Sequence, residues 1–411
     1  MKISKITNLF LNTFMQNSEK HIQKTKLTKK NALLIKEIYK IIDENESYIP
    51  NNFTLNEFDV TKNKTILQEY NFLSETQIFL SEKIQQKIIK TVKKIKKISL
   101  NIFGIKYNIH FFLFDETSDI IFLLNEITRL IFLISRFNLN KKITELDIHF
   151  ILLNLKKELP KKDEILNSYY VNTGLTWACK YPKGEIIIYR KEECLKVFIH
   201  ELMHALCFDF SNLSMNEQVI QKITNMFFIK ESTFSITETY CEFWANIINS
   251  LLFCYNHTNN ENDFLNLFLL INTFERNFAI FQCVKILDYM GLKYSTIISK
   301  SKMNKKKSIT HYNEQSNVFA YYIIKMVWLY YTNDFLTLFD NQNINLINSK
   351  KSYNYLNQLL NKTSQLYKKR ILLKDIKDNE TIYKKIKENK QDKSELCETL
   401  RMSIIEDAKI N

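Results

Sequence analysis

Two histidines and one glutamate near the middle of the chain have the residue types and the spacing of a metal-assisted hydrolytic site. His200, Glu201 and His204 form the pattern HExxH inside the stretch Lys191–Phe210. Residues four apart lie one turn apart on the same face of a helix, so both imidazoles can reach one metal ion. Glu201 lies beside them and can act as a general base on a metal-bound water. The pattern therefore predicts a zinc-activated water.

The residues around this motif have the periodicity of an amphipathic helix. Five apolar side chains recur on the side opposite the two histidines: Leu195, Phe198, Ile199, Leu202 and Leu206. At about 100° per residue, one face of this helix is then apolar and the other is left for polar chemistry. The alternative is a core helix with two hydrogen-bonded histidines, because a pattern with three fixed positions also occurs by chance.

The rest of the chain predicts an α+β protein that is mainly helical. Only 4 Gly and 3 Pro occur in 411 residues, which favours long helices over frequent turns. Extended Ile- and Phe-rich runs predict strands over Leu100–Phe103, Tyr107–Phe114 and Leu146–Leu155, and a hairpin over Thr176–Tyr189. Helices are predicted over Leu27–Asp43, 74–98, Ser118–Phe137, Asn216–Phe228, Ile236–Tyr255, Phe264–Tyr289 and Val318–Tyr331.

This order of elements divides the chain into four consecutive regions. We expect an N-terminal helical region at 1–98, a sheet with the HExxH helix at 99–210, a helical region at 211–349 and a charged appendage at 350–411. Within the third region, the lysine-rich stretch Ser299–Ser308 is expected to be a linker or an exposed loop.

Charge and cysteine content indicate the environment of the protein. The net charge of +14 permits attraction to nucleic acid, but the lysines are spread along the chain without an aromatic-basic RNA motif. This favours a solvated surface over a specific nucleic-acid site. Seven cysteines without a CxxC pair favour free thiols in a reducing compartment. No signal peptide and no uninterrupted membrane span is evident, so a soluble intracellular protein is expected.

The order of strands, HExxH helix and later helices resembles the zincin fold over roughly residues 99–332. The resemblance implies a small twisted sheet, the HExxH helix on the floor of a cleft, a helical lower subdomain and a polypeptide substrate that adds as an extra strand. The stretch from Thr173 to Phe210 also resembles uncharacterised metallopeptidase-like proteins of large DNA viruses. That second resemblance implies a location in the host cytoplasm or the virion.

A catalytic zinc takes three protein ligands, so a third ligand is needed. No glycine and histidine follow soon after His204, which argues against the metzincin continuation. Glu238 and Glu242 lie one turn apart, and the order Glu-Thr-Tyr-Cys-Glu resembles the ligand segment of gluzincins, which include thermolysin-like enzymes. That register makes Glu238 the ligand and Glu242 its supporting acid. The aminopeptidase-like register makes Glu242 the ligand, and a capping box with Ser235 is a purely structural role for Glu238.

Peptide hydrolysis also needs a donor for the oxyanion of the tetrahedral intermediate. The resemblance to thermolysin-like enzymes implies a donor downstream of the third ligand, where His311, Tyr321 and Tyr322 stand. An exposed histidine and two core tyrosines are the alternative. The isolated His110 and His149 are expected to be structural.

The sequence therefore predicts a gluzincin-type zinc metallopeptidase. Its expected groups are a Zn²⁺ ion on His200, His204 and Glu238 or Glu242, the base Glu201 and the oxyanion donor His311. Two other functions remain open. One is a catalytically inactive zincin-fold protein with a structural or virion role, and the other is a basic protein associated with nucleic acid.

Overall fold

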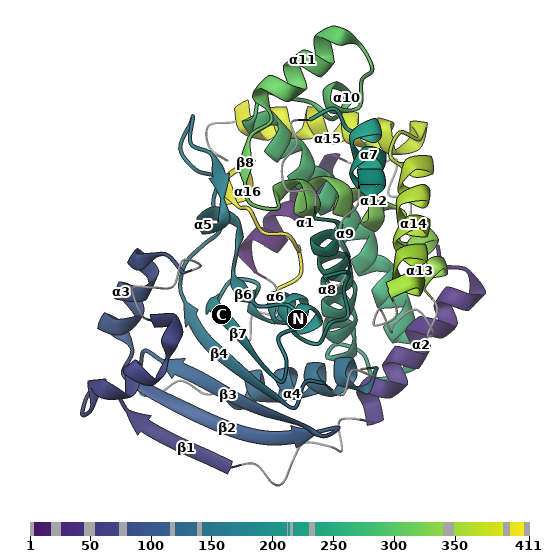
Figure 1. Ribbon diagram of the computed structural model, residues 1–411. Coiled ribbons are helices and arrows are strands. Elements are labelled where there is room, and N and C mark those ends of the chain that lie inside the picture. The colour runs from purple at the N-terminus through teal and green to yellow at the C-terminus, as the bar shows by residue number, and fades with distance from the viewer. Residues whose placement is uncertain are drawn as a thin grey trace. The chain divides into compact units, whose positions relative to one another are not determined.

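The chain is α+β and mainly helical, as predicted, and it divides into two compact units (Figure 1). The computed structural model describes residues 4–17, 26–44, 54–73, 80–115, 120–137, 142–211, 213, 217–229, 235–339, 349–388 and 395–406. We call the units the helical unit (Met1–Lys40, Lys157–Val171 and Asp209–Ala408) and the sheet unit (Ile41–Lys156, Asn172–Phe208 and Lys409–Asn411). The units therefore interleave along the chain, whereas four consecutive regions were expected.

The sheet unit contains a mixed six-stranded sheet in the order β1-β2-β3-β4-β7-β6. The strands are β1 (Thr54–Asp59), β2 (Lys94–Ile102), β3 (Ile105–Leu113), β4 (Glu145–Leu153), β6 (Gly174–Thr176) and β7 (Lys183–Arg190). The neighbours β3 and β4, and β4 and β7, are parallel, while the other pairs are antiparallel. Phe103 and Gly104 both have positive φ between β2 and β3, as a two-residue type I′ hairpin requires.

Alternate side chains of the strands face opposite sides of this sheet. On one side, Phe111 of β3 stacks on Phe150 of β4, which in turn packs against Phe198 of helix α6 (Cys194–Ala205). On the other side, Phe112 and Ile151 belong to a core covered by α3 (Glu82–Thr91), η2 (Lys64–Glu69) and η3 (Asn71–Leu73). Helix α4 (Ile121–Arg136) packs against α6 and β2. The α6 helix is thus packed on the β4–β7–β6 end of the sheet.

The helical unit is built around two long, adjacent helices, α8 (Ile236–Tyr255) and α9 (Glu261–Tyr289), which pack against each other (Figure 1). Helix α9 also contacts α12 (Lys325–Tyr330) and α15 (Arg370–Glu388). The other helices are α1 (Lys5–Asn17), α2 (Lys29–Glu44), α5 (Ser168–Val171), α7 (Glu217–Met226), α10 (Tyr294–Ile297), α11 (Lys302–His311), α13 (Thr332–Leu338), α14 (Ser349–Leu366), α16 (Glu395–Glu398) and the π-helix η4 (Phe319–Ile324). The short parallel strands β5 (Leu166–Asn167) and β8 (Glu314–Gln315) form a second sheet.

Some elements predicted from the sequence are present in the structure, and others have different bounds. The predicted hairpin, with strands at Thr176–Tyr181 and Glu185–Tyr189, is present with a shifted first strand: β6 ends at Thr176, pairs antiparallel with β7, and residues 177–182 connect the two. The helix predicted over 74–98 is shorter, since α3 ends at Thr91 and β2 begins at Lys94, and residues 74–79 lie outside the described part of the chain. Pairing with β3 decides this, because Ile95 and Ile98 stand opposite Phe112 and Ile109.

The lysine-rich stretch expected to be a linker is largely helical. It forms most of α11, whose first turn is capped by the Ser301 hydroxyl accepting from the Asn304 N–H. Within 350–411, where a charged appendage was expected, α14 and α15 carry buried side chains, and residues 399–405 are also buried. Over the described residues, no helix has both the length and the apolar character needed to cross a membrane.

Candidate metal centre

His200 and His204 face each other on α6. Their Nε2 atoms are 3.1 Å apart, and their ring centroids are 4.7 Å apart with the ring planes inclined by 69°. Two Zn–N bonds of about 2.0–2.1 Å at a tetrahedral angle place the two nitrogens about 3.3–3.4 Å apart. The imidazole pair therefore already has nearly the spacing that one zinc ion requires. Glu201 is buried beside them in the same helix, with 7% of its surface exposed.

The end of α6 is fixed directly after His204 by a Schellman motif. The Phe208 N–H donates to the Met203 carbonyl at 2.8 Å, and the Cys207 N–H donates to the His204 carbonyl at 3.1 Å. Cys207 has φ 61°, in the left-handed region where such motifs usually have glycine. The Cys179 N–H also donates to the His204 carbonyl, at 3.1 Å. The backbone of His204 is therefore held from two segments of the sheet unit.

Cys179 and Cys207 are joined by a disulfide, with their Cα atoms 5.0 Å apart. This differs from the expectation that all seven cysteines are free thiols. The five remaining cysteines, all within the described residues, are free: Cys194, Cys241, Cys254, Cys283 and Cys397. The spacing of 28 residues between the two partners carries no signal in the sequence, because the sheet brings them together.

Glu238 stands in the first turn of α8, where its backbone N–H donates to the Ser235 hydroxyl at 3.4 Å. The serine half of the predicted capping box is therefore present. The Glu238 carboxylate accepts a hydrogen bond of 2.8 Å from the Tyr321 hydroxyl. Tyr321 lies in the π-helix η4, an irregularity that occurs frequently at functional sites. This bond fixes the position of one Glu238 oxygen.

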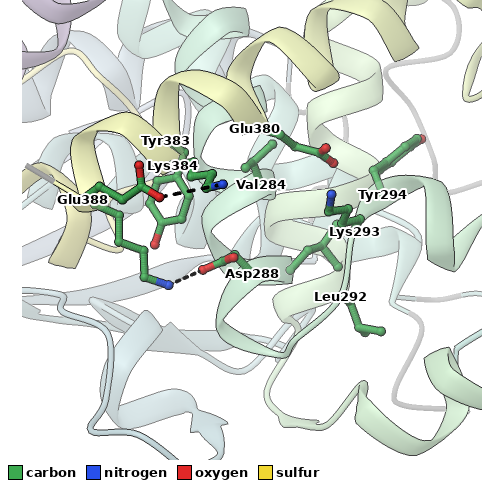
Figure 2. Close-up of a pocket in the computed structure, with 11 residues that line it drawn as sticks. Val284, Asp288, Leu292, Lys293, Tyr294, Glu380, Tyr383, Lys384 and Glu388 are labelled. Carbon is green, nitrogen blue, oxygen red and sulfur yellow. Dashed lines mark hydrogen bonds and ion pairs between the residues drawn. The ribbon is translucent and has the colours of Figure 1, made fainter.

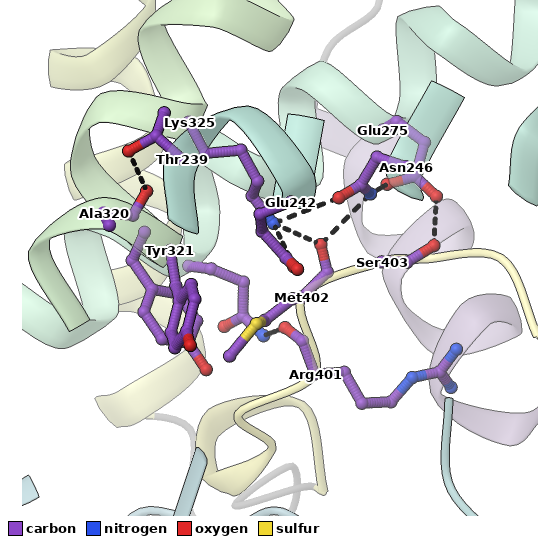
Figure 3. Close-up of polar contacts among 12 residues, drawn as sticks. Thr239, Glu242, Asn246, Glu275, Ala320, Tyr321, Lys325, Arg401, Met402 and Ser403 are labelled. Atoms are coloured by element: carbon purple, nitrogen blue, oxygen red, sulfur yellow. Dashed lines mark hydrogen bonds and ion pairs between the residues drawn. The ribbon is translucent and has the colours of Figure 1, made fainter. Parts of the chain in front are cut away.

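Glu242, one turn further along α8, lies in a different environment. Its carboxylate is 3.4 Å from the Nζ atom of Lys325, and both side chains are 2% exposed. Lys325 also donates to Asn246 at 3.3 Å and to the Met402 carbonyl at 2.7 Å (Figure 3). Lys325 was not among the site residues predicted from the sequence. Its signal was a single lysine within the apolar run Phe319–Tyr330, which implies a buried charge that needs a partner.

The predicted oxyanion donors have three different surroundings. His311 is exposed at the end of α11, where its Nδ1 atom is 3.0 Å from the Lys307 carbonyl. Tyr322 is buried and donates to the Leu400 carbonyl at 2.5 Å. Tyr321 alone of the three is seen bonded to a predicted metal ligand. The structure thus pairs His200 with His204 in the sheet unit, and Glu238 with Tyr321 and Glu242 with Lys325 in the helical unit.

A separate hollow of about 510 Å³ lies between α9 and α15 in the helical unit (Figure 2). Its polar lining consists largely of charged side chains in surface ion pairs, such as Lys387 with Asp288 at 2.7 Å and Lys384 with Glu388 at 3.8 Å. None of the predicted site residues lines this hollow. This hollow is therefore not part of the predicted metal centre.

Comparison of this chain with known protein families, with characterised proteins and with solved structures finds no match.

Proposed function

We propose that this protein is a zinc-dependent metallopeptidase of the gluzincin type, with His200, His204 and Glu238 as the metal ligands. The observation that carries the proposal is the imidazole pair on α6, with its Nε2 atoms 3.1 Å apart. Two imidazoles and one carboxylate are donors that could hold a metal ion, and several families of catalytic zinc sites use this set. A bound zinc ion supplies a Lewis acid, which lowers the pKa of a water and polarises a peptide carbonyl.

In the proposed reaction Glu201 moves the proton. Its carboxylate takes a proton from the attacking water and later delivers it to the nitrogen of the leaving amine, as the peptide C–N bond breaks. Glu201 and the two histidines come from one buried helix that is packed on the sheet. A rigid support of this kind favours the fixed geometry that proton transfer needs.

Between the two acids of α8, Glu238 is the better ligand. Its carboxylate accepts a hydrogen bond from a neutral phenol, which orients the acid without adding a counter-charge. The charge of Glu242 is already paired with Lys325 in a buried environment. Using Glu242 as a ligand would leave that lysine without its counter-charge, which is costly in the interior. We therefore assign Glu242 to the support of α8, and Tyr321 to the positioning of Glu238.

Metal analysis combined with peptide cleavage tests this function. The purified protein is expected to hold about one zinc per chain, and His200→Ala or His204→Ala to remove it. Glu201→Gln is expected to retain zinc and fold, but to cleave a peptide library about 10²–10⁴-fold more slowly, because the general base is lost. His257→Ala is the matched control, since that imidazole bonds to the Phe253 carbonyl at 2.8 Å.

The outcomes separate the rival functions. A folded protein that binds no zinc contradicts the proposal. Zinc binding that depends on both histidines, without cleavage of any peptide, indicates instead a zincin-like protein with a structural role.

A further inference from the structure

Residues 399–405, which we call the 399–405 segment, run through the interior of the helical unit without helical structure (Figures 1 and 3). Four of its apolar side chains are buried, with 5% or less of their surface exposed: Leu400, Met402, Ile404 and Ile405. Figure 3 shows Met402 and Ser403 among side chains of α8, α9 and α12. The segment therefore occupies a groove walled by α8, α9, η4 and α12, and α1 also contributes, since the Thr7 hydroxyl donates to the Ile404 carbonyl at 2.6 Å.

Side chains of these walls donate to successive carbonyl groups of the segment. The donors are Lys285 to Thr399 at 2.6 Å, Tyr322 to Leu400 at 2.5 Å, Gln282 to Arg401 at 2.5 Å, Lys325 to Met402 at 2.7 Å and Asn249 to Ile405 at 3.4 Å. Lys285 and Lys325 are both buried. A buried ammonium is costly unless it is paired, so these lysines need the carbonyl groups that the segment provides.

Glu275 of α9 accepts hydrogen bonds from N–H groups of the same segment. Its Oε1 atom accepts from the Ile404 N–H and the Ile405 N–H, both at 3.1 Å, and from the Ser403 hydroxyl at 2.5 Å. Glu275 is 1% exposed. Its burial raises the pKa of the carboxyl, while the bond from Ser403 and the backbone N–H groups oppose that rise. The carboxylate therefore also depends on the segment.

The bonding pattern is that of a bound peptide. Up to Leu400 the backbone is tied to another backbone, through a bridge between Glu158 and Thr399 and a bond from the Leu400 N–H to the Lys157 carbonyl. Beyond that point, side chains from other helices bond to the backbone groups described above, and side chains of the segment add local bonds, such as the Ile405 N–H to the Ser403 hydroxyl at 3.1 Å. Proteins that bind extended peptides hold the main chain in this way and use pockets for its side chains.

We propose that this groove is a polypeptide-binding site, and that its resident ligand is the chain's own 399–405 segment, which leaves and returns while the helices stay folded. The groove takes an extended main chain with buried apolar side chains at its Leu400, Met402 and Ile404 positions.

Occupancy of the groove also has a consequence for α8. Glu238, Glu242, Asn246 and Asn249 follow one face of this helix at spacings of four, four and three residues. Lys325 bonds to both Glu242 and the Met402 carbonyl, so the occupant helps to hold the lysine on this face. A loss of zinc affinity on release of the segment is therefore expected, and this consequence rests on the proposed function.

An exchange experiment on the full chain tests the proposal. A cleavage site for a sequence-specific protease is inserted between Glu388 and Glu395, so that cutting leaves α16 and the segment held without a covalent link. A fluorescent synthetic peptide of residues 395–411 is then added in excess. We expect the peptide to replace the cut segment and to co-elute with the protein at one per chain, with unchanged circular dichroism. Failure of the peptide to enter the folded, cut protein overturns the proposal.

Substitutions of side chains in the groove identify which of them bind the peptide. Glu275→Gln and Lys285→Met are each expected to weaken peptide binding at least about tenfold, since each leaves backbone groups of the peptide without a charged partner. Glu126→Gln is the matched control, because Glu126 is equally buried in the sheet unit, where it pairs with Arg129 at 2.8 Å. Equal peptide affinity in all three variants contradicts the assignment of the groove.

Hydrogen exchange on the uncut chain gives an answer even if a variant does not fold. The amides of Ile404 and Ile405 are expected to exchange at least about tenfold faster than those in the centres of α8 and α9, because the segment opens locally. Exchange of all of these amides at one common rate shows that the segment is part of the core and overturns the proposal. Zinc content is measured separately: a protein that exchanges its segment but never binds zinc refutes the proposed function alone.

Discussion

His200 and His204 reach the spacing of zinc ligands because of local geometry alone. They lie one turn apart on a buried helix whose end is fixed directly after His204. Glu238 and Glu242 also lie one turn apart, but their partners differ. Tyr321 holds Glu238 with a neutral hydrogen bond, whereas Lys325 pairs with Glu242 as a buried cation. At the scale of single residues, the two acids therefore have separable roles.

Substituting the two acids separately tests these roles. Glu238→Gln is expected to remove most zinc affinity with little loss of stability, because its carboxylate is partly exposed. Glu242→Gln is expected to lower the free energy of unfolding by up to about 3–5 kcal/mol, because it leaves the buried charge of Lys325 without its partner, and to weaken zinc binding only about 10–100-fold. Zinc titration and urea unfolding measure the two effects. The reverse pattern assigns the metal to Glu242.

The Tyr321 hydroxyl is expected to position Glu238. Tyr321→Phe removes that hydrogen bond and should weaken zinc binding about 10–100-fold, as removal of an outer-shell partner of a metal ligand typically does. Tyr322→Phe is the matched control, because its hydroxyl bonds to the Leu400 carbonyl instead. That variant should lose stability and keep its zinc affinity. Similar zinc affinities in wild type and Tyr321→Phe argue against the positioning role.

At the scale of elements, the end of α6 depends on one residue in an unusual conformation. Cys207 occupies the left-handed position of the Schellman motif, where a β-carbon is unfavourable. In a Cys179→Ala background, which lacks the disulfide, Cys207→Gly is therefore expected to be more stable than Cys207→Ala by about 1–2 kcal/mol. Denaturant unfolding of the two double variants measures this difference.

The control for this comparison is Ala205→Gly, two residues earlier and still within α6. There the same change should destabilise by about 0.5–1 kcal/mol, because glycine is unfavourable inside a helix. Equal stability of the glycine and alanine variants at position 207 would contradict the left-handed conformation of this residue at the end of α6.

Stability of the sheet unit should depend on pH through one buried histidine, His110. The His110 and His149 rings have centroids 4.7 Å apart, and they bond to Tyr70 and Glu185 respectively. Burial, and then the charge of His149, lower the pKa of His110 to about 3. The unfolded chain has an ordinary histidine pKa of about 6.5 and so takes up a proton first as the pH falls. The stability that neutral His110 contributes is complete above about pH 6.5 and is lost progressively down to about pH 3.

A variant without this imidazole should show a weaker pH dependence. Between about pH 6 and pH 4, the free energy of unfolding of wild type should fall more steeply than that of His110→Phe, by about 1.4 kcal/mol per pH unit. Chemical denaturation at a series of pH values measures this slope. Parallel curves for wild type and His110→Phe contradict a neutral, buried His110.

At the scale of the whole molecule, two units share one chain that passes between them several times. The histidine pair lies in the sheet unit and Glu238 in the helical unit. The net charge of +14 lies on a lysine-rich chain with several surface ion pairs, such as Lys183 with Asp147 at 2.9 Å. Such surface pairs contribute little to stability, which leaves the apolar cores of the two units as the main source.

The sequence by itself determined what depends on local spacing. The apolar stripe through Phe198, Ile199 and Leu202 predicted the HExxH helix, and these three side chains are fully buried. The start of α8 at its Ser235 cap is confirmed for the same reason, and the β6–β7 hairpin is present with its first strand ending at Thr176. Each of these features follows from neighbouring residues on one helix or one strand pair, where the periods of 3.6 and 2 apply directly.

The tertiary structure decided what depends on partners far away in the chain. The bonds of Tyr321 to Glu238 and of Lys325 to Glu242 each join residues 83 apart in sequence. The disulfide between Cys179 and Cys207, and the burial of the 399–405 segment, also leave no local signal. Spacing along the chain shows which side chains share one face of a helix or strand. It does not show which other element packs against that face. That choice depends on how buried charges and backbone groups find partners once the helices and the sheet have packed.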